Sequence, residues 1–136
     1  MIYIVCGPPA SGKSWVCEQL SKSFSYVPHD EYQDTKHYAK ELIDAKKSDW
    51  PNKILGDCPF AERPLKEALE SLGEKAEFYF IVETPEVLSE RYKERGKPIP
   101  KGHLTRLNSM PARAKEWGAF HGTSEQVLEK LKNITA

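Results

Sequence analysis

The sequence has few features of a secreted, membrane-spanning or metal-stabilised protein. Its three cysteines, Cys6, Cys17 and Cys58, show no Cys-x-x-Cys spacing, and its four histidines show no ligand spacing. No hydrophobic run approaches the roughly 20 residues of a membrane-spanning helix, and no basic residue precedes the first apolar run, as it would in a signal peptide. We therefore expect a cytoplasmic protein with reduced, buried thiols, no protein-built zinc site and no contact with membranes.

Charged residues balance over the whole chain but not along it. The 136 residues carry a formal net charge of zero, which provides no overall attraction to nucleic acid. Between Arg91 and Lys115, however, eight lysines and arginines occur with a single acid, Glu94. Such a run is typical of a solvated helix face, and equally of a cationic lid over a phosphate site. We expect one domain, 1–136, with residues 91–115 as the candidate lid.

A glycine-rich segment follows the first apolar run. Residues 7–14 have the pattern Gly-x-x-x-x-Gly-Lys-Ser, between the apolar run 2–6 and a helical pattern that begins near Trp15. Glycines at these places let backbone N–H groups converge on a phosphate at the N-terminus of the next helix. Lys13 can then bind the β- and γ-phosphates and the Ser14 hydroxyl can bind Mg²⁺. The predicted ATP-binding residues are Gly7, Pro8, Pro9, Ala10, Ser11, Gly12, Lys13, Ser14 and Trp15.

Strands and helices are predicted to alternate along the chain. Apolar runs indicate strands at 2–6, 24–29, 53–57 and 77–82. Helical patterns cover 14–23, 31–47, 65–72, 84–95, 104–110, 112–117 and 124–131, the last with Ser124 as its expected N-cap. The alternation predicts an α/β fold, a three-layer α/β/α sandwich with a parallel sheet of four to five strands and a helical lid. Ligands of such sheets bind at the carboxyl ends of the strands.

Acidic residues follow the second and third predicted strands at that edge. Asp30 is a candidate general base for an attacking hydroxyl, although an aspartate at this place also serves as the N-cap of the next helix. Glu31 is the alternative base. Asp57 ends the third strand, where it can hold Mg²⁺ or contact the substrate. Because Cys58 follows it, rather than a glutamate that could activate water, the pattern favours transfer to a hydroxyl over hydrolysis.

Two arginines stand out in the candidate lid. Arg91 and Arg95 are four residues apart on one predicted helix and share a face, and Gly96 lets the chain turn after them. The guanidinium group can grip two phosphate oxygens at once. We expect Arg95 to stabilise charge on the transferred phosphoryl group, with Arg91 as the second candidate. The alternative is an exposed helix on which Glu90 and Glu94 pair with these arginines.

Together these motifs resemble the kinase domain of bacteriophage-type polynucleotide 5′-hydroxyl kinases, within the small phosphate-loop (P-loop) kinases. The resemblance covers residues 2–110 and implies an enzyme that uses ATP and Mg²⁺ to phosphorylate a hydroxyl of a nucleic acid or nucleotide, at a 5′ end or on a modified base. It also implies that Lys13 and Ser14 hold ATP and Mg²⁺, that Asp30 is the general base and that Arg95 covers the transferring group. The matching segments are the P-loop, His29-Asp30-Glu31-Tyr32, Ile54-Leu55-Gly56-Asp57, Thr84-Pro85 and Glu90-Arg91-Tyr92-Lys93-Glu94-Arg95-Gly96-Lys97-Pro98-Ile99-Pro100.

The acceptor is less well defined than the donor. The family often has an arginine three residues after its base, where this chain has Gln33, which we count with Asp30 and Asp57 as a substrate-binding candidate. Two other functions remain open: a small-molecule kinase for a nucleoside, nucleotide or sugar, and a nucleotide-binding switch or regulatory protein. A polynucleotide acceptor needs a basic channel lined by aromatic side chains. Besides the basic run, its candidates are Tyr26, Tyr32, Tyr38 and Tyr92.

Overall fold

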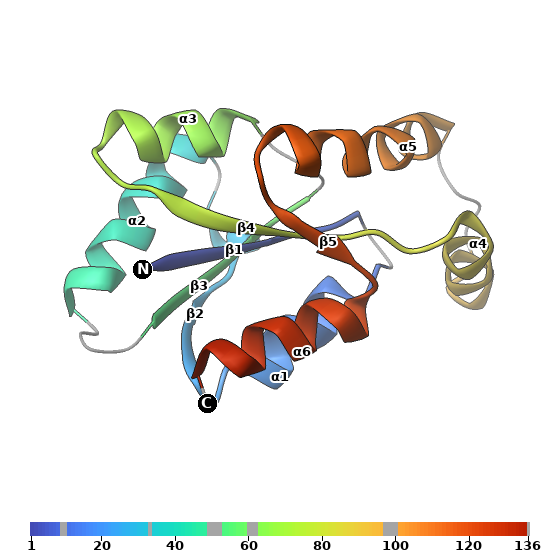
Figure 1. The fold of residues 1–136 in the computed structure, drawn as a ribbon, viewed down its shortest axis with the longest axis horizontal. Helices are drawn as coiled ribbons and strands as arrows, with labels where there is room; N and C mark the ends of the chain where they lie inside the picture. The colour runs from blue at the N-terminus through green and yellow to red at the C-terminus, as the bar shows by residue number, and fades with distance from the viewer. Residues whose placement is uncertain (9–10, 33, 49–52, 60–62, 97–100, 136) are drawn as a thin grey trace.

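The computed structural model contains a five-stranded parallel sheet covered by helices (Figure 1). It describes residues 1–8, 11–32, 34–48, 53–59, 63–96 and 101–135. In the spatial order β2-β3-β1-β4-β5, the strands are β1 (Ile2–Cys6), β2 (Phe24–Val27), β3 (Lys53–Cys58), β4 (Ala76–Ile81) and β5 (Phe120–Gly122). The helices are α1 (Lys13–Leu20), α2 (Thr35–Ser48), α3 (Arg63–Ser71), α4 (Pro85–Glu94), α5 (Lys101–Glu116) and α6 (Ser124–Thr135), with a short 3-10 turn, η1 (His29–Glu31), before α2.

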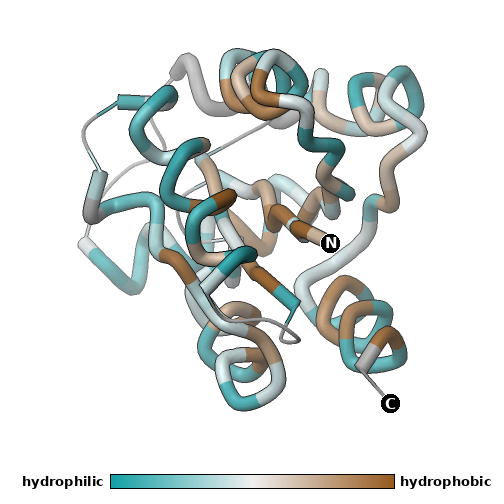
Figure 2. The backbone as a smooth tube through the Cα atoms, turned by 90° about the vertical axis from the view of Figure 1, so that its left-hand side faces the viewer, coloured by the Kyte–Doolittle hydropathy of each residue, from teal (hydrophilic) through white to brown (hydrophobic). Residues whose placement is uncertain are grey.

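Helices cover both faces of the sheet. Figure 1 shows α1 and α6 side by side below the strands, and α3 and α5 above them, while α4 lies beyond the end of β4. In Figure 2, brown and teal stretches alternate along the helices, as expected when one side of each helix packs on the sheet. Along the described ranges, no helix is both long enough and apolar enough to cross a bilayer. The predicted α/β/α sandwich is confirmed.

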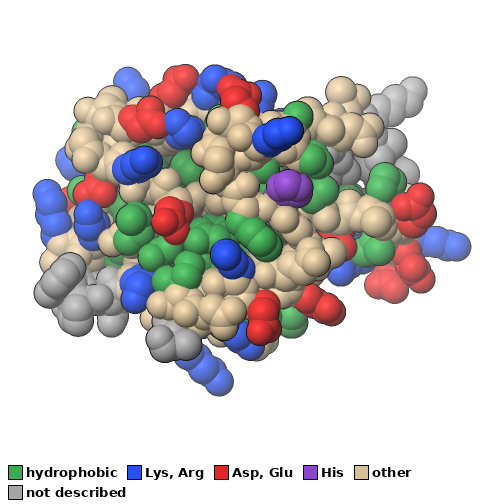
Figure 3. Space-filling model, viewed as in Figure 1, with side chains coloured by type: hydrophobic (Ala, Val, Ile, Leu, Met, Phe, Trp, Pro, Cys, Tyr) green, Lys and Arg blue, Asp and Glu red, His purple; other side chains and the backbone are tan. Residues whose placement is uncertain are grey.

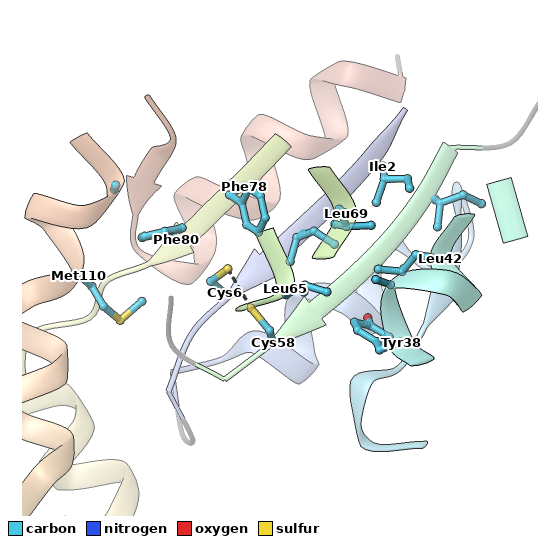
Figure 4. Packing of buried hydrophobic residues seen from close by; sticks show 14 of the residues in the cluster. Ile2, Cys6, Tyr38, Leu42, Cys58, Leu65, Leu69, Phe78, Phe80 and Met110 are labelled. Atoms are coloured by element: carbon cyan, nitrogen blue, oxygen red, sulfur yellow. Dashed lines mark hydrogen bonds between the residues drawn. The ribbon is translucent and has the colours of Figure 1, made fainter. Parts of the chain in front are cut away.

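Side chains of β1 alternate between the two covered faces. Ile2, Ile4 and Cys6 pack with α2, α3 and α5, whereas Tyr3 and Val5 pack with α1 and α6. All five residues of β1 are buried, which explains the continuous apolar run in the sequence. Burial of side chains of this size contributes about 1.5–3 kcal/mol each. Figure 4 shows the first layer, with Ile2, Cys6, Tyr38, Leu42, Cys58, Leu65, Leu69, Phe78, Phe80 and Met110 labelled.

The polar segments singled out from the sequence lie at the carboxyl edge of this sheet. Because all pairings are parallel, the P-loop after β1, η1 after β2 and Asp57 near the end of β3 emerge on the same side. The N–H of Gly7 donates a hydrogen bond to the carbonyl oxygen of Cys58 at 3.2 Å. The pairing of β1 with β3 therefore continues into the start of the P-loop.

The predicted break between helices 104–110 and 112–117 is wrong. Pro111 lies inside α5, which is one helix from Lys101 to Glu116. An interior proline lacks an N–H donor and costs about 3 kcal/mol in an exposed helix. Met110 and Ala114, on either side of it, are both buried in the core, and this packing offsets the cost.

The starts of α2 and α6 also differ from prediction, each because of a cap. Helix α2 begins at Thr35 rather than at 31, because Oδ1 of Asp34 accepts a hydrogen bond from the N–H of His37 at 2.7 Å and caps the helix. At α6, the Thr123 hydroxyl accepts from the N–H of Gln126 at 3.3 Å, and the Gln126 side chain accepts from the N–H of Thr123 at 2.9 Å. This reciprocal capping box makes Ser124 the first helical residue instead of the predicted N-cap.

Candidate active site

The P-loop approaches its neighbours too closely for side chains at two glycines. Gly12 has φ of +95°, and a Cβ there would lie 2.9 Å from Cβ of Ser124. A Cβ on Gly7 would lie 2.5 Å from Oγ of Ser11. Glycine is therefore required for the conformation at Gly12 and for the contact at Gly7. Pro9 and Ala10, also predicted to bind nucleotide, lie outside the described residues.

Ser11 provides a separate indication of a ligand. It is 1% exposed, and its hydroxyl has no hydrogen-bond partner within the described part of the chain. A buried polar group left in this state costs about 1–3 kcal/mol, which a bound phosphate oxygen would recover. The half-buried Lys13 and the exposed Ser14 follow at the start of α1. These residues fit a magnesium nucleotide, with Lys13 on the phosphates and the Ser14 hydroxyl on Mg²⁺.

Asp57 connects the P-loop to two strand ends. One carboxylate oxygen lies 3.7 Å from the Lys13 ammonium, and the other accepts a hydrogen bond from the N–H of His29 at 2.8 Å. The backbone N–H of Asp57 donates to the Tyr38 hydroxyl at 2.9 Å, and that hydroxyl donates to the carbonyl of Val27 at 2.6 Å. Asp57 and Tyr38 together hold the ends of β2 and β3 beside the P-loop.

Asp30 lies in η1 and is exposed. Since Asp34 caps α2, the alternative role of Asp30 as the N-cap of that helix is wrong. Asp30 opens onto a cavity of about 400 Å³ that also reaches Lys13 and Asp57. The side chain of Glu31, the alternative base, and all of Gln33 lie outside the described part of the structure. Among the described residues, the lining is Pro8, Gly12, Lys13, Ser14, Trp15, Tyr26, Asp30, Asp57, Pro59 and Arg95.

The two arginines of α4 occupy different places. Arg95, the exposed C-cap of the helix, lines the cavity of Asp30 and also a second cavity of about 370 Å³. Arg91 lines the second cavity, and its Nη2 lies 3.9 Å from Oε1 of Glu83. The structure therefore brings Arg95 together with both aspartates, whereas Arg91 lines the second cavity and not the first. The second cavity is lined by Gly12, Trp15, Arg91, Glu94, Arg95 and Ser124.

Two tyrosines, which the sequence indicated only as candidates for a nucleic-acid channel, lie beside Asp57 at this site. Tyr26 lines the first cavity, and burial, with contributions from the Cys17 thiol and the Asp57 carboxylate, raises its pKa well above the ordinary value. Burial and the charge of Asp57 raise the pKa of Tyr38 in the same direction. Both phenols therefore stay protonated at neutral pH and act as hydrogen-bond donors rather than bases. The polar partners of Tyr38 are 11 and 19 residues away in the sequence, so no local pattern marks them.

The three cysteines are buried, reduced thiols, in agreement with expectation. The Cys6 and Cys58 sulfurs lie 3.2 Å apart, and Figure 4 shows them facing each other from β1 and β3. Burial raises the pKa of Cys6, and burial followed by the charge of Asp57 raises that of Cys17 to about 12. Within the described ranges, no three His, Cys, Asp or Glu side chains are grouped to hold a metal. Mg²⁺ held with nucleotide phosphates and water needs only one or two protein ligands, for which Ser14 and Asp57 are the candidates.

Comparison with known proteins places the fold. No protein-family model matches the chain, and no curated protein matches it in sequence. Solved structures do match. The tunicamycin resistance protein of Deinococcus radiodurans superposes with a TM-score of 0.75 at 17% identity, covering 95% of this chain and 91% of that one.

Two kinases are also similar over nearly the whole chain. A gluconokinase from Sinorhizobium meliloti gives a TM-score of 0.59 at 18% identity, covering 98% of this chain and 92% of that one. The deoxyadenosine kinase of M. mycoides, solved with bound dATP, gives 0.53 at 15% identity, covering 98% of each chain. The fold is that of the P-loop kinases, and none of these structures is a phage polynucleotide kinase.

Proposed function

We propose that this protein is an ATP-dependent kinase that transfers the γ-phosphoryl group to an alcohol hydroxyl. The observation that carries the proposal is one cavity that brings together Lys13 and Ser14 of the P-loop, the carboxylates of Asp30 and Asp57, and the guanidinium of Arg95. Phosphoryl transfer requires these parts: a phosphate cradle, a magnesium ligand, a base and a cation for the transferred group. The similarity to a gluconokinase, a sugar kinase and a deoxyadenosine kinase supports the same class of reaction.

Each residue has a defined task in this reaction. The acceptor hydroxyl gives its proton to the Asp30 carboxylate while its oxygen bonds to the γ-phosphorus and the bond to the β-phosphate oxygen breaks, which releases ADP. Mg²⁺ supplies neutralisation of phosphate charge when bound. Lys13 and Arg95 balance the charge on the transferring group from two sides. The cavity beside Arg91 and Ser124 adjoins the P-loop at Gly12 and has a volume suited to the nucleoside end of ATP.

Hydrolysis is disfavoured by the residue that follows Asp57. Cys58 is completely buried, and its sulfur contacts Cys6 rather than the cavity. It therefore cannot orient a water molecule at the phosphate. This supports a hydroxyl acceptor over a switch protein that hydrolyses its nucleotide.

Two acceptor classes fit different observations. A nucleic-acid hydroxyl is favoured by exposed basic side chains on α4 and α5, among them Lys93, Arg106 and Lys115. A small molecule is favoured by the cavity volume of about 400 Å³ and by the burial of Tyr38 and Tyr92, which removes them from any stacking channel. Basic and acidic side chains are also interspersed on the face in Figure 3, with no stripe of one sign. We favour the small molecule as acceptor.

A labelled-phosphate assay tests the proposal and its acceptor together. The protein is incubated with γ-labelled ATP, Mg²⁺ and one acceptor at a time: sugars, nucleosides, nucleoside monophosphates, 5′-hydroxyl oligonucleotides and hydroxymethylated duplex DNA. Label is expected in a small alcohol and is absent with a Lys13→Ala variant. Label in DNA alone would move the acceptor to nucleic acid. ATP hydrolysis that no acceptor stimulates would overturn the kinase proposal.

A further inference from the structure

We propose that Glu83 is a positioning residue for the donor nucleotide, an inference that rests on the proposed function. Glu83 lies just beyond β4, and its side chain is only 8% exposed. Its Oε1 accepts hydrogen bonds from the backbone N–H and the hydroxyl of Ser124, both at 3.0 Å. The same oxygen lies 3.9 Å from Nη2 of Arg91. One buried carboxylate oxygen therefore joins the end of β4, the first residue of α6 and the helix α4.

On the α6 side, Glu83 holds Ser124, which lines the second cavity, in position. Cβ of Ser124 lies 2.9 Å from the position of a Cβ on Gly12, so the start of α6 is in contact with the P-loop. A carboxylate is favourable at a helix N-terminus, where unpaired N–H groups carry partial positive charge. The charge of Glu83 thus holds Ser124 against Gly12, and both residues line the cavity beside Arg91.

On the lid side, Glu83 holds the Arg91 side chain of α4. Arg91 and Arg95 lie one turn apart on the same side of this helix, and both line the second cavity. An ion pair between Arg91 and a nearly buried carboxylate is screened much less by solvent than a surface pair. The pair keeps the Arg91 side chain at the wall of the second cavity.

These contacts predict an effect on binding rather than on chemistry. Glu83 is absent from the lining of the cavity that holds Lys13 and Asp30, and it contacts neither residue through any interaction described. Removal of its charge loosens the start of α6 and releases the Arg91 side chain. Since hydrogen bonds to a charged group are worth more than neutral ones, we expect donor affinity to fall about tenfold or more.

Titration calorimetry with the magnesium complex of a non-hydrolysable ATP analogue tests this inference. Glu83→Gln preserves size and is expected to bind the analogue about tenfold more weakly, with kcat within about twofold of the parent enzyme. Glu90→Gln makes the same chemical change at an exposed position of α4 and is expected to bind normally. Parent-like affinity in Glu83→Gln would overturn the inference alone. Failure of the parent protein to bind the analogue would overturn the proposed function as well.

A double-mutant cycle separates positioning from general stability. In an Arg91→Ala background, Glu83→Gln is expected to cost less affinity than in the parent, because the pair is already broken. Fully additive losses would contradict a role through Arg91. If Glu83→Gln does not fold, Ser124→Ala replaces it, because it removes one donor to Glu83 and keeps the charge. A few-fold loss of affinity is then expected, and an unchanged affinity would overturn the proposal.

Discussion

The Lys13 ammonium lies 3.7 Å from the Asp57 carboxylate, and both side chains are largely shielded from solvent. The P-loop lysine is therefore already engaged by a negative group at the place where nucleotide phosphates would bind. Phosphate oxygens compete with Asp57 for the same cation. The ion pair therefore holds the Lys13 ammonium beside the end of β3.

Lys13→Ala is expected to abolish phosphoryl transfer, because the β- and γ-phosphates lose their nearest cation. It also removes the cation beside the largely buried Asp57 carboxylate, which lowers the free energy of unfolding by about 1–3 kcal/mol. Transfer of label and urea denaturation measure the two effects. Lys22→Ala, in the exposed turn after α1, is the matched control and should change neither. Full activity in Lys13→Ala would remove the P-loop from the reaction.

Asp30→Asn is expected to lower kcat by about 10²–10⁴-fold while ATP affinity stays within a few-fold, as for loss of a general base. Asp34→Ala provides the contrast, because Asp34 caps α2. That variant should lose about 0.5–2 kcal/mol of stability and keep its kcat. Kinetics with thermal denaturation of both variants check the assignment. The base assignment fails if Asp30→Asn changes stability and leaves turnover intact.

Arg95→Ala is expected to lower kcat by about 10³-fold or more, because Arg95 opens onto the same cavity as Asp30 and Asp57. Arg91→Ala should mainly raise the KM for ATP, because Arg91 lines the neighbouring cavity. Lys93→Ala, exposed on the same helix, is the control for lost charge. Steady-state kinetics at varied ATP distinguish the three. An Arg95→Ala effect confined to KM would exclude Arg95 from the transition state.

Tyr38→Phe keeps the buried ring and removes the hydroxyl that bonds to Val27 and Asp57. We expect a loss of about 1–3 kcal/mol of stability, since two backbone groups lose their partner, and a fall in kcat, since the ends of β2 and β3 carry Asp30 and Asp57. Tyr79→Phe is the control, because its hydroxyl donates to Glu77 near the start of β4. It should affect stability alone. Equal kcat in the two variants would contradict a role for Tyr38 at the site.

The buried thiols predict a loss of stability in alkali. The pKa of Cys17 is raised from 9.0 to about 12 by burial and by Asp57. Between these values the unfolded chain releases a proton that the folded chain keeps, so the free energy of unfolding falls as pH rises from about 9 to 12. Urea denaturation across this range measures the fall. A thiol reagent at pH 8 should react with the protein in urea and not with the native protein, and rapid native labelling would contradict the burial.

Much of the fold could be predicted because several of its strands are more apolar than the segments around them. Strands such as β1 are buried on both faces and appear as apolar runs, and the P-loop motif locates the carboxyl edge of the sheet. The fifth strand, Phe120–Gly122, escaped prediction because it is short and contains one large apolar residue. The continuity of α5 through Pro111 depends on core packing around Met110, which no local propensity encodes.

The sequence predicts where the candidate site lies, but it does not predict the hydrogen bonds and ion pairs between its residues. Parallel strands bring Asp30 and Asp57 to the same edge whatever their side chains do. The hydroxyl of Tyr38 and the carboxylate of Glu83 instead depend on partners distant in sequence, such as Ser124, 41 residues from Glu83. Their roles follow from the packing of α2 on β3 and of α6 on the P-loop, which becomes visible only in three dimensions.

Strand β1 lies at the centre of the sheet, and the site residues fall into two groups on either side of it. Tyr26, Asp30 and Asp57 come from β2, η1 and β3 on one side, while Arg91 and Ser124 come from elements beyond β4 on the other. Both groups of residues lie next to the P-loop, which lines both cavities at Gly12. In the proposed reaction, substitutions at Tyr26 or Asp30 are therefore expected to alter the acceptor side and to leave Arg91 and Ser124 on the donor side in place. In a small fold arranged in this way, the residues on one side of the P-loop can change while those on the other side keep their positions.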